Sequence, residues 1–540
     1  MALLALHFGG EIKNVVDLAD LEICQSKKVA SADVCGHFAA PVNAGKYAPC
    51  RADVKASGAT WQRDYTAVTH PGECMGLFKA YDVRGVVPEQ LNPPIAFRIG
   101  YGFAKLLSED KPAPRVIVGM DARPSGPALA AAFMDGLATG GAEARFIGPC
   151  STPMLYWAVA GEPGNHGGAM ITASHNPARY NGIKFCREEA IPIAGDTGLA
   201  DIEAFAATAH EPPPVWQHKP VVDLLDGDAP EGLFPPLGFN PRVFAGYVSH
   251  LRRFAKRTPE KLKVAVDTAN GMGGVYLGFL RSLGLELHVI NGEFDGTFPN
   301  HEANPSRLEN LKPLCELVRQ RQCSLGIALD GDADRAVFID EAGTPVGQDI
   351  ITALIASEML KRHKGAPILY DLRSSRIVAE SVEAAGGRAV RERVGHSFMK
   401  ATMRKIGCVF GGELAGHYYF KDNWYADSAI IAVIEVLNAL GITGAKLGEL
   451  VRPYRKYAQT GEINFRVKDK EGVFQKVQEA FADGKIDHLD GVTVEFPDWW
   501  MNLRASNTES LIRLNMEAQT PALLQDKFAQ VQSLVGEPDA

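Results

Sequence analysis

The chain lacks any apolar run as long as a transmembrane helix, which needs about 20 residues. Its opening stretch MALLALHF is apolar, but it is short and has no basic start, so it does not match a signal peptide. The nine cysteines include no Cys-x-x-Cys pair, and an odd number cannot be fully paired within one chain. We therefore expect reduced thiols in a cytoplasmic protein that has no membrane partner.

An excess of positive charge is also missing, because 64 acidic side chains outnumber 56 basic ones and give a net charge of −8. This balance is opposite to that of proteins that bind nucleic acid by charge, so we expect no such partner. A small anionic substrate is still compatible, because a few local arginines and lysines can outweigh the overall sign. At 540 residues the chain exceeds the size of one hydrophobic core, and several domains are expected.

Residues 1–76 show no sustained helical or strand periodicity, unlike the rest of the chain. They hold four cysteines at wide and irregular spacings, which do not match the ligand spacing of a zinc site: Cys24, Cys35, Cys50 and Cys74. We predict that this segment is an N-terminal extension that is disordered or loosely packed.

From residue 77 onward one pattern occurs three times. A strand that ends in aspartate is followed by a helical run and a second strand, and the aspartates are Asp121, Asp267 and Asp371. Each unit then has a further short strand that leads into a polar loop: ASHNP (173–177), DGDADR (330–335) and GGELAGH (411–417). This alternation predicts three related α/β domains with mixed sheets, whose loops face a central cleft.

The last eighty or so residues differ, because EINFRV and VTVEF alternate apolar and polar side chains as half-buried strands do. They predict a smaller α+β domain. The expected organisation is an extension over 1–76, α/β domain I over 77–218, domain II over 219–344, domain III over 345–457 and α+β domain IV over 458–540.

The loop DGDADR places three carboxylates at alternating positions after an apolar strand, on Asp330, Asp332 and Asp334. Hard oxygen ligands this close together favour Mg²⁺. The same spacing matches the start of a calcium-binding EF-hand loop. That alternative fails because Arg335 stands where such a loop needs glycine, and the apolar run after it is typical of a strand.

The other polar loops permit two interpretations each when they are taken alone. Ser174 follows a short apolar strand, where it could carry chemistry or only cap a turn. RASNTES offers the planar guanidinium of Arg504 and small hydrogen-bonding side chains, which suit a phosphate cradle but equally a hairpin turn. Arg84, beside a glycine expected in a turn, and His396, at an expected helix start, are unremarkable by themselves.

Taken together and in this order, TASHNP, DGDADR, GGELAGH and RASNTES resemble the α-D-phosphohexomutase superfamily over residues 77–540. RASNTES and the start YDVRG are most similar to its bacterial phosphomannomutase/phosphoglucomutase branch. The resemblance implies four domains around a cleft and an isomerase that moves a phosphoryl group between positions 1 and 6 of a hexose phosphate. It further implies an enzyme phosphoserine, a hexose 1,6-bisphosphate intermediate that also acts as activator, and Mg²⁺, but no nucleotide.

The resemblance also implies a role for each matched residue. Ser174 would be the phosphoserine and would ligate Mg²⁺ together with Asp330, Asp332 and Asp334. The remaining implied roles are phosphate support by His175, proton transfer by Lys184, charge neutralisation by Arg84, acid/base chemistry by His396, sugar binding by Tyr81, Arg335, Glu413 and His417, and phosphate binding by Arg504, Ser506, Asn507 and Thr508.

Substrate preference is where the chain departs from its branch. The family loop usually has a serine where this chain has Ala415, so one sugar-facing hydroxyl is absent. Mannose and glucose phosphates are the expected substrates, for a monomer or a weak homodimer. The alternatives are a phosphoglucosamine mutase, whose branch tends to have glycine at the position of Asn507, and a phosphosugar-binding protein without turnover.

Overall fold

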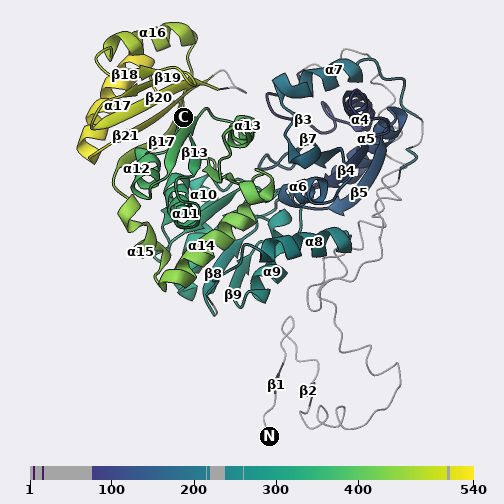
Figure 1. Ribbon diagram of the computed structural model, residues 1–540, viewed down its shortest axis with the longest axis horizontal. Coiled ribbons are helices and arrows are strands. Elements are labelled where there is room, and N and C mark those ends of the chain that lie inside the picture. Colours follow the sequence, from purple (N-terminus) through teal and green to yellow (C-terminus); the bar gives the residue numbers. More distant parts are fainter. Residues whose placement is uncertain are drawn as a thin grey trace. The chain divides into compact units, whose positions relative to one another are not determined.

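The computed structural model describes residues 4–5, 15–16, 76–213, 216–218, 238–259, 261–506 and 511–539 (Figure 1). Its contacts divide the chain into two units, Met1–Trp61 and Gln62–Ala540. In the first unit, β1 (Leu4–Ala5) pairs antiparallel with β2 (Val15–Val16). Apart from these strands and Gly76, the predicted extension over 1–76 and its four cysteines lie outside the described residues.

Three mixed sheets of the second unit share one order of four strands, to which domains I and II each add a fifth strand at one edge. The order is β3-β7-β6-β4-β5 in domain I, β12-β11-β10-β8-β9 in domain II and β14-β13-β15-β16 in domain III. In each sheet one strand (β4, β8 or β13) is parallel to both neighbours, and the strand after the polar loop runs antiparallel. The repeated α/β architecture predicted from the strand-ending aspartates is therefore confirmed.

The strands of domain I are β3 (Val83–Val86), β4 (Arg115–Met120), β5 (Glu143–Pro149), β6 (Gly167–Ile171) and β7 (Tyr180–Arg187). Those of domain II are β8 (Lys263–Asp267), β9 (Glu286–Ile290), β10 (Leu325–Leu329), β11 (Ala336–Ile339) and β12 (Pro345–Val346). Those of domain III are β13 (Pro367–Asp371), β14 (Arg388–Glu392), β15 (Phe410–Gly412) and β16 (Tyr418–Phe420).

The α-helices of domain I are α4 (Pro93–Ser108), α5 (Gly126–Thr139), α6 (Thr152–Ala160) and α7 (Ala200–Ala206). Those of domain II are α8 (Pro241–Arg252), α9 (Leu277–Ser282) and α10 (Leu308–Arg321). Those of domain III are α11 (Gln348–Arg362), α12 (Arg376–Ala384), α13 (His396–Ile406), α14 (Ala429–Thr443) and α15 (Leu447–Val451). Short one-turn segments are η1 (Glu188–Ala190), η2 (Gly195–Leu199), η3 (Met272–Tyr276), η4 (Lys421–Asn423) and η5 (Arg452–Tyr454).

Several helices begin where the sequence carries a capping residue. Asn92, Ser151 and Asn240 each accept a backbone N–H from the third residue on, at the starts of α4, α6 and α8. A proline occupies one of the first two positions of each helix, where its missing N–H costs nothing. These local signals mark the helix starts in the sequence.

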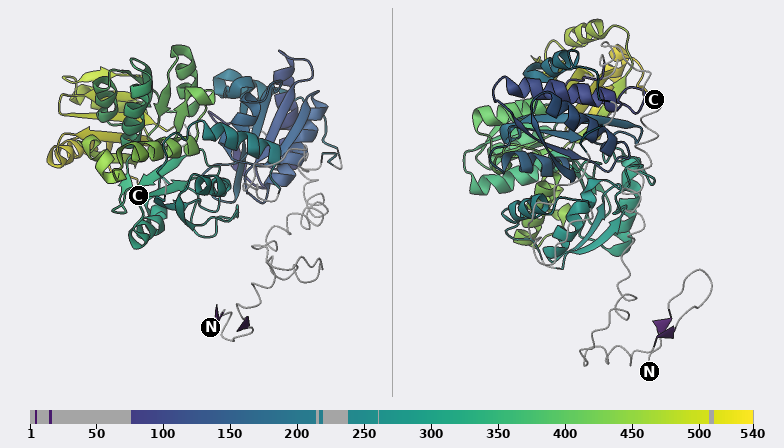
Figure 2. Two further views of the ribbon diagram at one scale, coloured as in Figure 1. Left: turned by 60° about the horizontal axis from the view of Figure 1, so that its bottom comes forward. Right: turned by 90° about the vertical axis from the view of Figure 1, so that its right-hand side faces the viewer.

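The domain I sheet is buried on both faces. Val116 and Val118 of β4 pack into a cluster with α4 and α5, whereas Ile117 between them packs into a second cluster. The second cluster continues through domains II and III, with Val264 of β8 and Ile368 of β13 among its members. One apolar core thus joins the three α/β domains, and Figure 2 gives their arrangement from two further directions.

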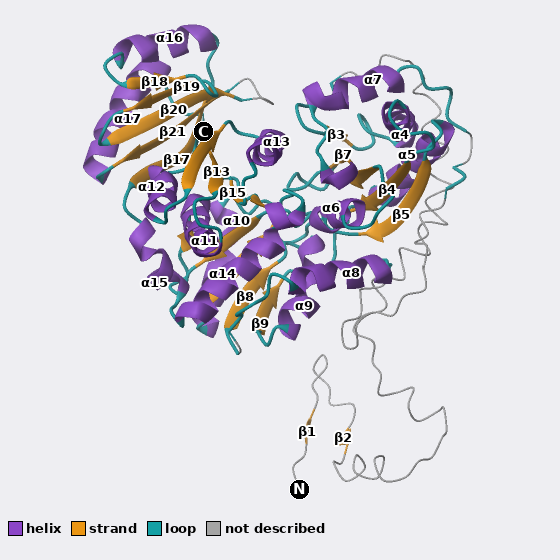
Figure 3. Cartoon of the chain, viewed as in Figure 1, coloured by secondary structure: helices purple, strands orange, loops and turns teal. Residues whose placement is uncertain are grey.

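Domain IV is an antiparallel sheet of order β17-β21-β20-β19-β18, with α16 and α17 packed on its apolar cluster (Figure 3). Its elements are β17 (Ala458–Phe465), α16 (Lys470–Ala480), β18 (Lys485–Asp487), β19 (Val492–Glu495), β20 (Trp499–Ala505), β21 (Ile512–Ala518) and α17 (Pro521–Val535). The predicted α+β domain is confirmed.

Among the described residues, no single helix has the length and apolar character to cross a membrane. The bent pair Ala429–Thr443 and Leu447–Tyr454 meets these criteria only when its two parts are taken together. The five cysteines in the described part of the chain are free and buried: Cys150, Cys186, Cys315, Cys323 and Cys408.

Candidate active site

The three polar loops occupy equivalent places, after β6, β10 and β15, and they meet. The hydroxyl of Ser174 in the first loop donates to Oδ2 of Asp330 in the second, at 2.8 Å. Nε of Arg335 in the second loop donates to Nε2 of His417 in the third, at 2.9 Å. Residues more than eighty positions apart in sequence are therefore brought into one polar site by the repeated strand order.

Ser174 lies in a strained, enclosed position. Its φ angle of +50° is in the left-handed region that side chains other than glycine rarely adopt, and the residue is 1% exposed. Its backbone N–H donates to Thr172 Oγ1 at 2.9 Å, and its Oγ lies 3.2 Å from Nδ1 of His175. The contacts hold the Ser174 hydroxyl towards the second loop.

Arg123, which the sequence analysis did not single out, supports the Ser174 loop from below. Its buried guanidinium donates to the backbone carbonyls of Ser174 at 2.8 Å and Asn176 at 2.7 Å, and further to those of Pro177 and Tyr180. Its Nε donates to Oδ2 of Asp121 at 3.0 Å. One side chain therefore fixes the path of the whole loop.

The same hydrogen bond between an arginine and the aspartate two residues before it recurs in domain III. Arg373 follows the strand-ending Asp371 at the same spacing, and its Nε donates to Asp371 Oδ2 at 3.0 Å. The recurring sequence Asp-x-Arg after β4 and β13 was the signal that would have found both arginines.

Gly331 explains how closely the first two loops approach. A Cβ atom at this position would lie 2.5 Å from the backbone oxygen of Ser174. Since that atom is backbone and cannot swing away, only glycine allows the aspartate loop to reach the serine.

The three aspartates form a buried acidic cluster. One carboxylate oxygen from each of Asp330, Asp332 and Asp334 lies within 4.8 Å of the others, and all three residues are no more than 1% exposed. Burial, together with the other two carboxylates, raises the pKa of Asp330 well above its usual range. Among the described residues, Oδ1 of Asp332 and Oδ1 of Asp334 have no hydrogen-bond donor. Unpartnered hard oxygens in such a set fit a divalent cation.

Lys184 approaches the aspartates from β7. Its Nζ lies 2.6 Å from Oδ2 of Asp332 and 2.6 Å from Oδ2 of Asp334. Burial alone would lower the pKa of this amine, but the two carboxylates outweigh it and raise the pKa above its usual value. The lysine is therefore a fixed cation next to the serine loop.

Arg84 lies inside a strand together with Gly85, for which the sequence predicts a turn. Both Arg84 and Gly85 belong to β3, because β3 pairs antiparallel with β7 and places Arg84 opposite Gly182. Its Nη1 donates to Oδ1 of Asn176 at 2.9 Å, so the guanidinium reaches the Ser174 loop.

Burial, with the nearby cations Arg335 and Arg84, lowers the pKa of His175 well below its usual value and keeps this imidazole neutral.

Tyr81 and His396 pair domain I with domain III. Their ring centroids lie 5.3 Å apart, and the Tyr81 hydroxyl donates to the backbone oxygen of Val394 at 3.2 Å. As expected, α13 begins at His396. A Cβ on Gly395 would lie 2.5 Å from the Tyr81 hydroxyl oxygen, and the φ of Gly395 is +136°, so this close approach depends on glycine.

Glu413 is held by its own domain. The N–H of Gly395 donates to its Oε1 at 3.1 Å, and the Tyr419 hydroxyl donates to its Oε2. The residue is 2% exposed. Its carboxylate is thus fixed beside the start of α13, close to His396.

Arg504 lies near the end of a strand rather than in the following loop, because β20 runs to Ala505 and Arg504 lies opposite Arg513 of β21. Three guanidinium groups surround the carboxylate of Glu462. Arg504 Nη2 is 2.7 Å from it, Arg513 Nη1 is 3.0 Å from it and Arg373 Nη1 is 3.5 Å from it. Three guanidinium groups in this position form a strong anion-binding site, and in this structure the anion is the carboxylate of Glu462.

The small side chains predicted beside Arg504 are only partly described. The backbone N–H of Ser506 donates to the oxygen of Leu511 at 2.9 Å, which closes the loop that joins β20 to β21. Asn507 and Thr508 lie outside the described residues.

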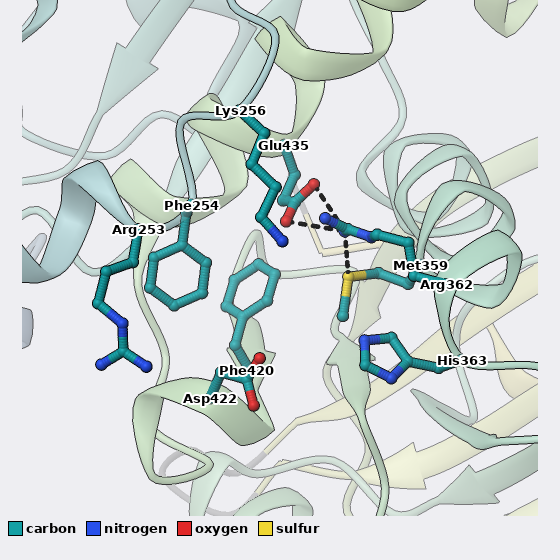
Figure 4. A pocket seen from close by; sticks show the side chains of 9 residues that line it. All are labelled: Arg253, Phe254, Lys256, Met359, Arg362, His363, Phe420, Asp422 and Glu435. Carbon is teal, nitrogen blue, oxygen red and sulfur yellow. Dashed lines mark hydrogen bonds and ion pairs between the residues drawn. The ribbon is translucent and has the colours of Figure 1, made fainter.

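A separate cavity of about 150 Å³ is lined by residues of domains II and III, and none of them is a predicted site residue (Figure 4). Its lining residues are Arg253, Phe254, Lys256, Met359, Arg362, His363, Phe420, Asp422 and Glu435. Arg362 donates to both carboxylate oxygens of Glu435 at 2.9 Å, so part of its positive charge is already balanced.

Comparison with known proteins gives one family over most of the second unit. The models of phosphoglucomutase/phosphomannomutase α/β/α domains I, II and III match residues 75–212, 245–343 and 347–457, and the model of the C-terminal domain matches 462–533. The phosphomannomutase of Methanocaldococcus jannaschii is 36% identical over 465 residues, which cover 86% of this chain and 98% of the relative. That of Escherichia coli K12 is 35% identical over 452 residues, covering 82% and 94%.

Solved structures show the same likeness. The crystal structure of a phosphoglucomutase/phosphomannomutase family protein from Burkholderia thailandensis superposes with a TM-score of 0.74 at 30% sequence identity. The superposition covers 86% of this chain and 98% of the other.

Proposed function

Because this chain belongs to the phosphoglucomutase/phosphomannomutase family, we propose that it is a phosphohexomutase that moves a phosphoryl group between positions 1 and 6 of a hexose phosphate, with mannose or glucose as the sugar. Relatives with these names are isomerases. The proposed course of reaction passes through a phosphate on Ser174 and a hexose 1,6-bisphosphate.

The observation that carries this proposal is the contact of the Ser174 hydroxyl with Asp330 at 2.8 Å inside the acidic cluster. A serine used only to cap a turn would not need a strained φ, a supporting arginine under its loop and a glycine opposite its carbonyl. These features fix the position of Oγ, and a fixed nucleophile is what in-line phosphoryl transfer requires.

The chain's own residues supply most of the needed charge. The Ser174 hydroxyl donates a hydrogen bond to Asp330, which holds Oγ in place for the attack on a phosphate. Lys184 and Arg84 then place positive charge beside the transferring group. Neutral His175 supports the same phosphate through its ring nitrogen.

The acidic cluster is the proposed Mg²⁺ site, with Ser174, Asp330, Asp332 and Asp334 as its ligands. When bound there, Mg²⁺ would polarise the phosphoryl oxygens and offset the charge of the carboxylates.

Binding of the sugar and of its non-reacting phosphate is proposed for the other loops. Glu413 and His417, with Tyr81 and Arg335, would contact the sugar, and His396 would exchange a proton with the reacting hydroxyl. Arg504, with Ser506, Asn507 and Thr508, would bind the second phosphate in place of the Glu462 carboxylate. A bisphosphorylated sugar that reverses its orientation between these sites would present either of its phosphates to Ser174.

The test is the variant Ser174→Ala, which removes the hydroxyl and leaves the cluster and the arginines in place. We expect mutase activity on mannose 1-phosphate and glucose 1-phosphate to fall by several orders of magnitude, because the tethered phosphate donor is lost. Binding of the sugar phosphate, measured by calorimetry, should change far less. The matched control is Ser533→Ala, at an exposed serine of α17.

Phosphopeptide mapping completes this test. Wild-type enzyme incubated with glucose 1,6-bisphosphate should gain one phosphate per chain, on the peptide that holds Ser174. Full activity of Ser174→Ala, or a phosphate found on another residue, would refute the proposed mechanism.

A further inference from the structure

A buried ion pair lies directly behind the proposed sugar site. Nζ of Lys400 is 2.6 Å from Oδ1 of Asp427, and Oδ2 of the same carboxylate is 2.8 Å from Nδ1 of His417. Lys400 is fully buried, Asp427 is 1% exposed and His417 is 5% exposed. Lys400 comes from α13, and Asp427 precedes α14, so two elements of domain III meet behind the third loop.

The proton on His417 can be assigned from its two neighbours. Arg335 Nε–H can only donate, so Nε2 of His417 must be the acceptor of their 2.9 Å hydrogen bond. The ring proton of the neutral imidazole is therefore on Nδ1, the nitrogen that faces Asp427. The result is a continuous series of contacts that runs from Lys400 through Asp427 and His417 to Arg335.

Lys400 stabilises this series of contacts by keeping the buried carboxylate of Asp427 ionised. Burial alone would raise the pKa of Asp427, but the charge of Lys400 and the contact with the ring N–H of His417 hold it well below its usual range, so the carboxylate stays ionised. The ammonium of Lys400 also lies 4.1 Å from the centroid of the Tyr156 ring, a further favourable contact for a buried cation.

A second metal site is the competing interpretation, because ligand atoms of Asp334, His417 and Asp427 lie within 4.8 Å of one another. Lys400 at 2.6 Å from Asp427 and Arg335 on the other nitrogen of His417 already supply positive charge to this group. A positioning network explains these contacts without a further ion.

We propose that Lys400 and Asp427 are positioning residues, which fix the His417 imidazole so that it holds the guanidinium of Arg335 in place for the sugar phosphate. The inference rests on the proposed function, and it concerns residues outside the matched motif loops. Among the described residues, the guanidinium of Arg335 is held at Nε, by the 2.9 Å hydrogen bond to His417 and by ion pairs of 3.9 Å with Asp330 and Asp334. Its two terminal nitrogens have four further N–H donors that can serve a substrate. Without the anchor, its long side chain would have to be ordered at each binding event.

The test is a double-mutant cycle between Asp427→Asn and Arg335→Ala. In the presence of Arg335, we expect Asp427→Asn to lower kcat/KM for mannose 1-phosphate by about tenfold, as for a coupled pair in one network. In the Arg335→Ala background, the same change should cost less than about twofold, because the group that it positions is gone. Equal losses in both backgrounds would mean that Asp427 serves only folding and would overturn the proposal.

The matched control is Glu435→Gln. Glu435 is also a buried carboxylate of domain III in an ion pair, with Arg362, but it faces the separate cavity of Figure 4. It should lower the melting temperature, as Asp427→Asn does, and leave kcat/KM within about twofold of the wild type in both Arg335 backgrounds. A tenfold kinetic loss here would show that any buried ion pair of the domain has this effect.

A second variant covers the case in which Asp427→Asn does not fold because Lys400 is left unpaired. Lys400→Met with Asp427→Asn removes both charges, and it should show the same dependence on Arg335. If the wild type binds mannose 1-phosphate in calorimetry but shows no turnover, the proposed function is wrong and the cycle is read from Kd instead. A wild type that neither binds nor turns over this sugar phosphate would overturn both proposals.

Discussion

At the scale of single residues, the aspartates of the second loop have the most demanding chemistry. Three carboxylates lie within 4.8 Å of one another, and the ammonium of Lys184 contacts only two of them. Like charges so close together destabilise the ionised state unless further positive charge is present. Asp332 is the informative member, because its Oδ2 already accepts from Thr152 and Lys184 while its Oδ1 has no donor among the described residues.

We predict that an excess of chelator abolishes mutase activity and that Mg²⁺ restores it better than Ca²⁺ does, since the site offers few, rigid oxygen ligands. Asp332→Asn should weaken Mg²⁺ binding by at least about tenfold, the loss that follows removal of even an outer partner of a metal site. Calorimetric titration with Mg²⁺ measures this, and circular dichroism should show an unchanged fold. Asp526→Asn, on an exposed face of α17, is the control. Full turnover in chelator would contradict the metal assignment.

At the scale of elements, the strand-ending Asp-x-Arg units explain how loops are held at the sheet edges. Arg123 and Arg373 make the same Nε bond to the aspartate two residues before, and each then makes a further contact through its terminal nitrogens. Arg123 binds the carbonyls of the Ser174 loop, whereas Arg373 reaches Glu462 of domain IV. In domain II, Asp267 keeps only the first part of the pattern and accepts from the N–H of Ala269 at 2.8 Å.

We predict that Arg123→Met destabilises the protein by about 3–5 kcal/mol, because it leaves a buried carboxylate unpaired and takes donors from four carbonyls. The midpoint of the first unfolding transition in a thermal scan should fall accordingly. Activity below this midpoint should also fall, since Oγ of Ser174 loses its fixed position. The control Arg145→Met changes an exposed arginine of the same domain and should have little effect. A variant with wild-type stability would show that the loop holds its shape without Arg123.

At the scale of the whole molecule, the domains are joined in two different ways. Domains I, II and III share one apolar cluster, whereas the cluster of domain IV contains, among the described residues, only its own members. Domain IV meets domain III through polar contacts such as Arg376 to the backbone oxygen of Pro497 at 2.8 Å and Gln459 to Asp349 at 2.8 Å. A polar interface of this kind permits relative movement of domains III and IV.

The division of the chain after Trp61 leads to a prediction about its first residues. All site contacts described above lie within residues 76–540, and the family match begins at residue 75. A chain that starts at Cys74 should therefore fold and keep kcat/KM within about twofold of the full-length value. Circular dichroism and the mutase assay check this, with the full-length chain as control. An insoluble or inactive truncated chain would show that residues 1–73 contribute to the fold.

The types of the elements and the three-fold repeat were determined by the sequence itself. Apolar periodicity, strand-ending aspartates and capping residues such as Asn92 and Ser151 act over a few neighbours, so they can be read locally. The order of the four motif loops also indicated the family and named Ser174 and the aspartates. Two positions that the sequence predicts outside strands, Gly85 and Arg504, lie in strands because pairing with β7 and β21 extends these strands.

The partners of the site residues were decided by the tertiary structure alone. Lys184 follows Ser174 by ten residues, but its amine contacts aspartates some 150 positions further on, at 2.6 Å. Lys400 and Asp427 have no distinctive neighbours in the sequence, and their importance comes from burial beside groups that the repeated sheets bring to one place. A buried charge is stable only where a partner of opposite charge meets it, and that meeting depends on the packing of three domains rather than on any local pattern.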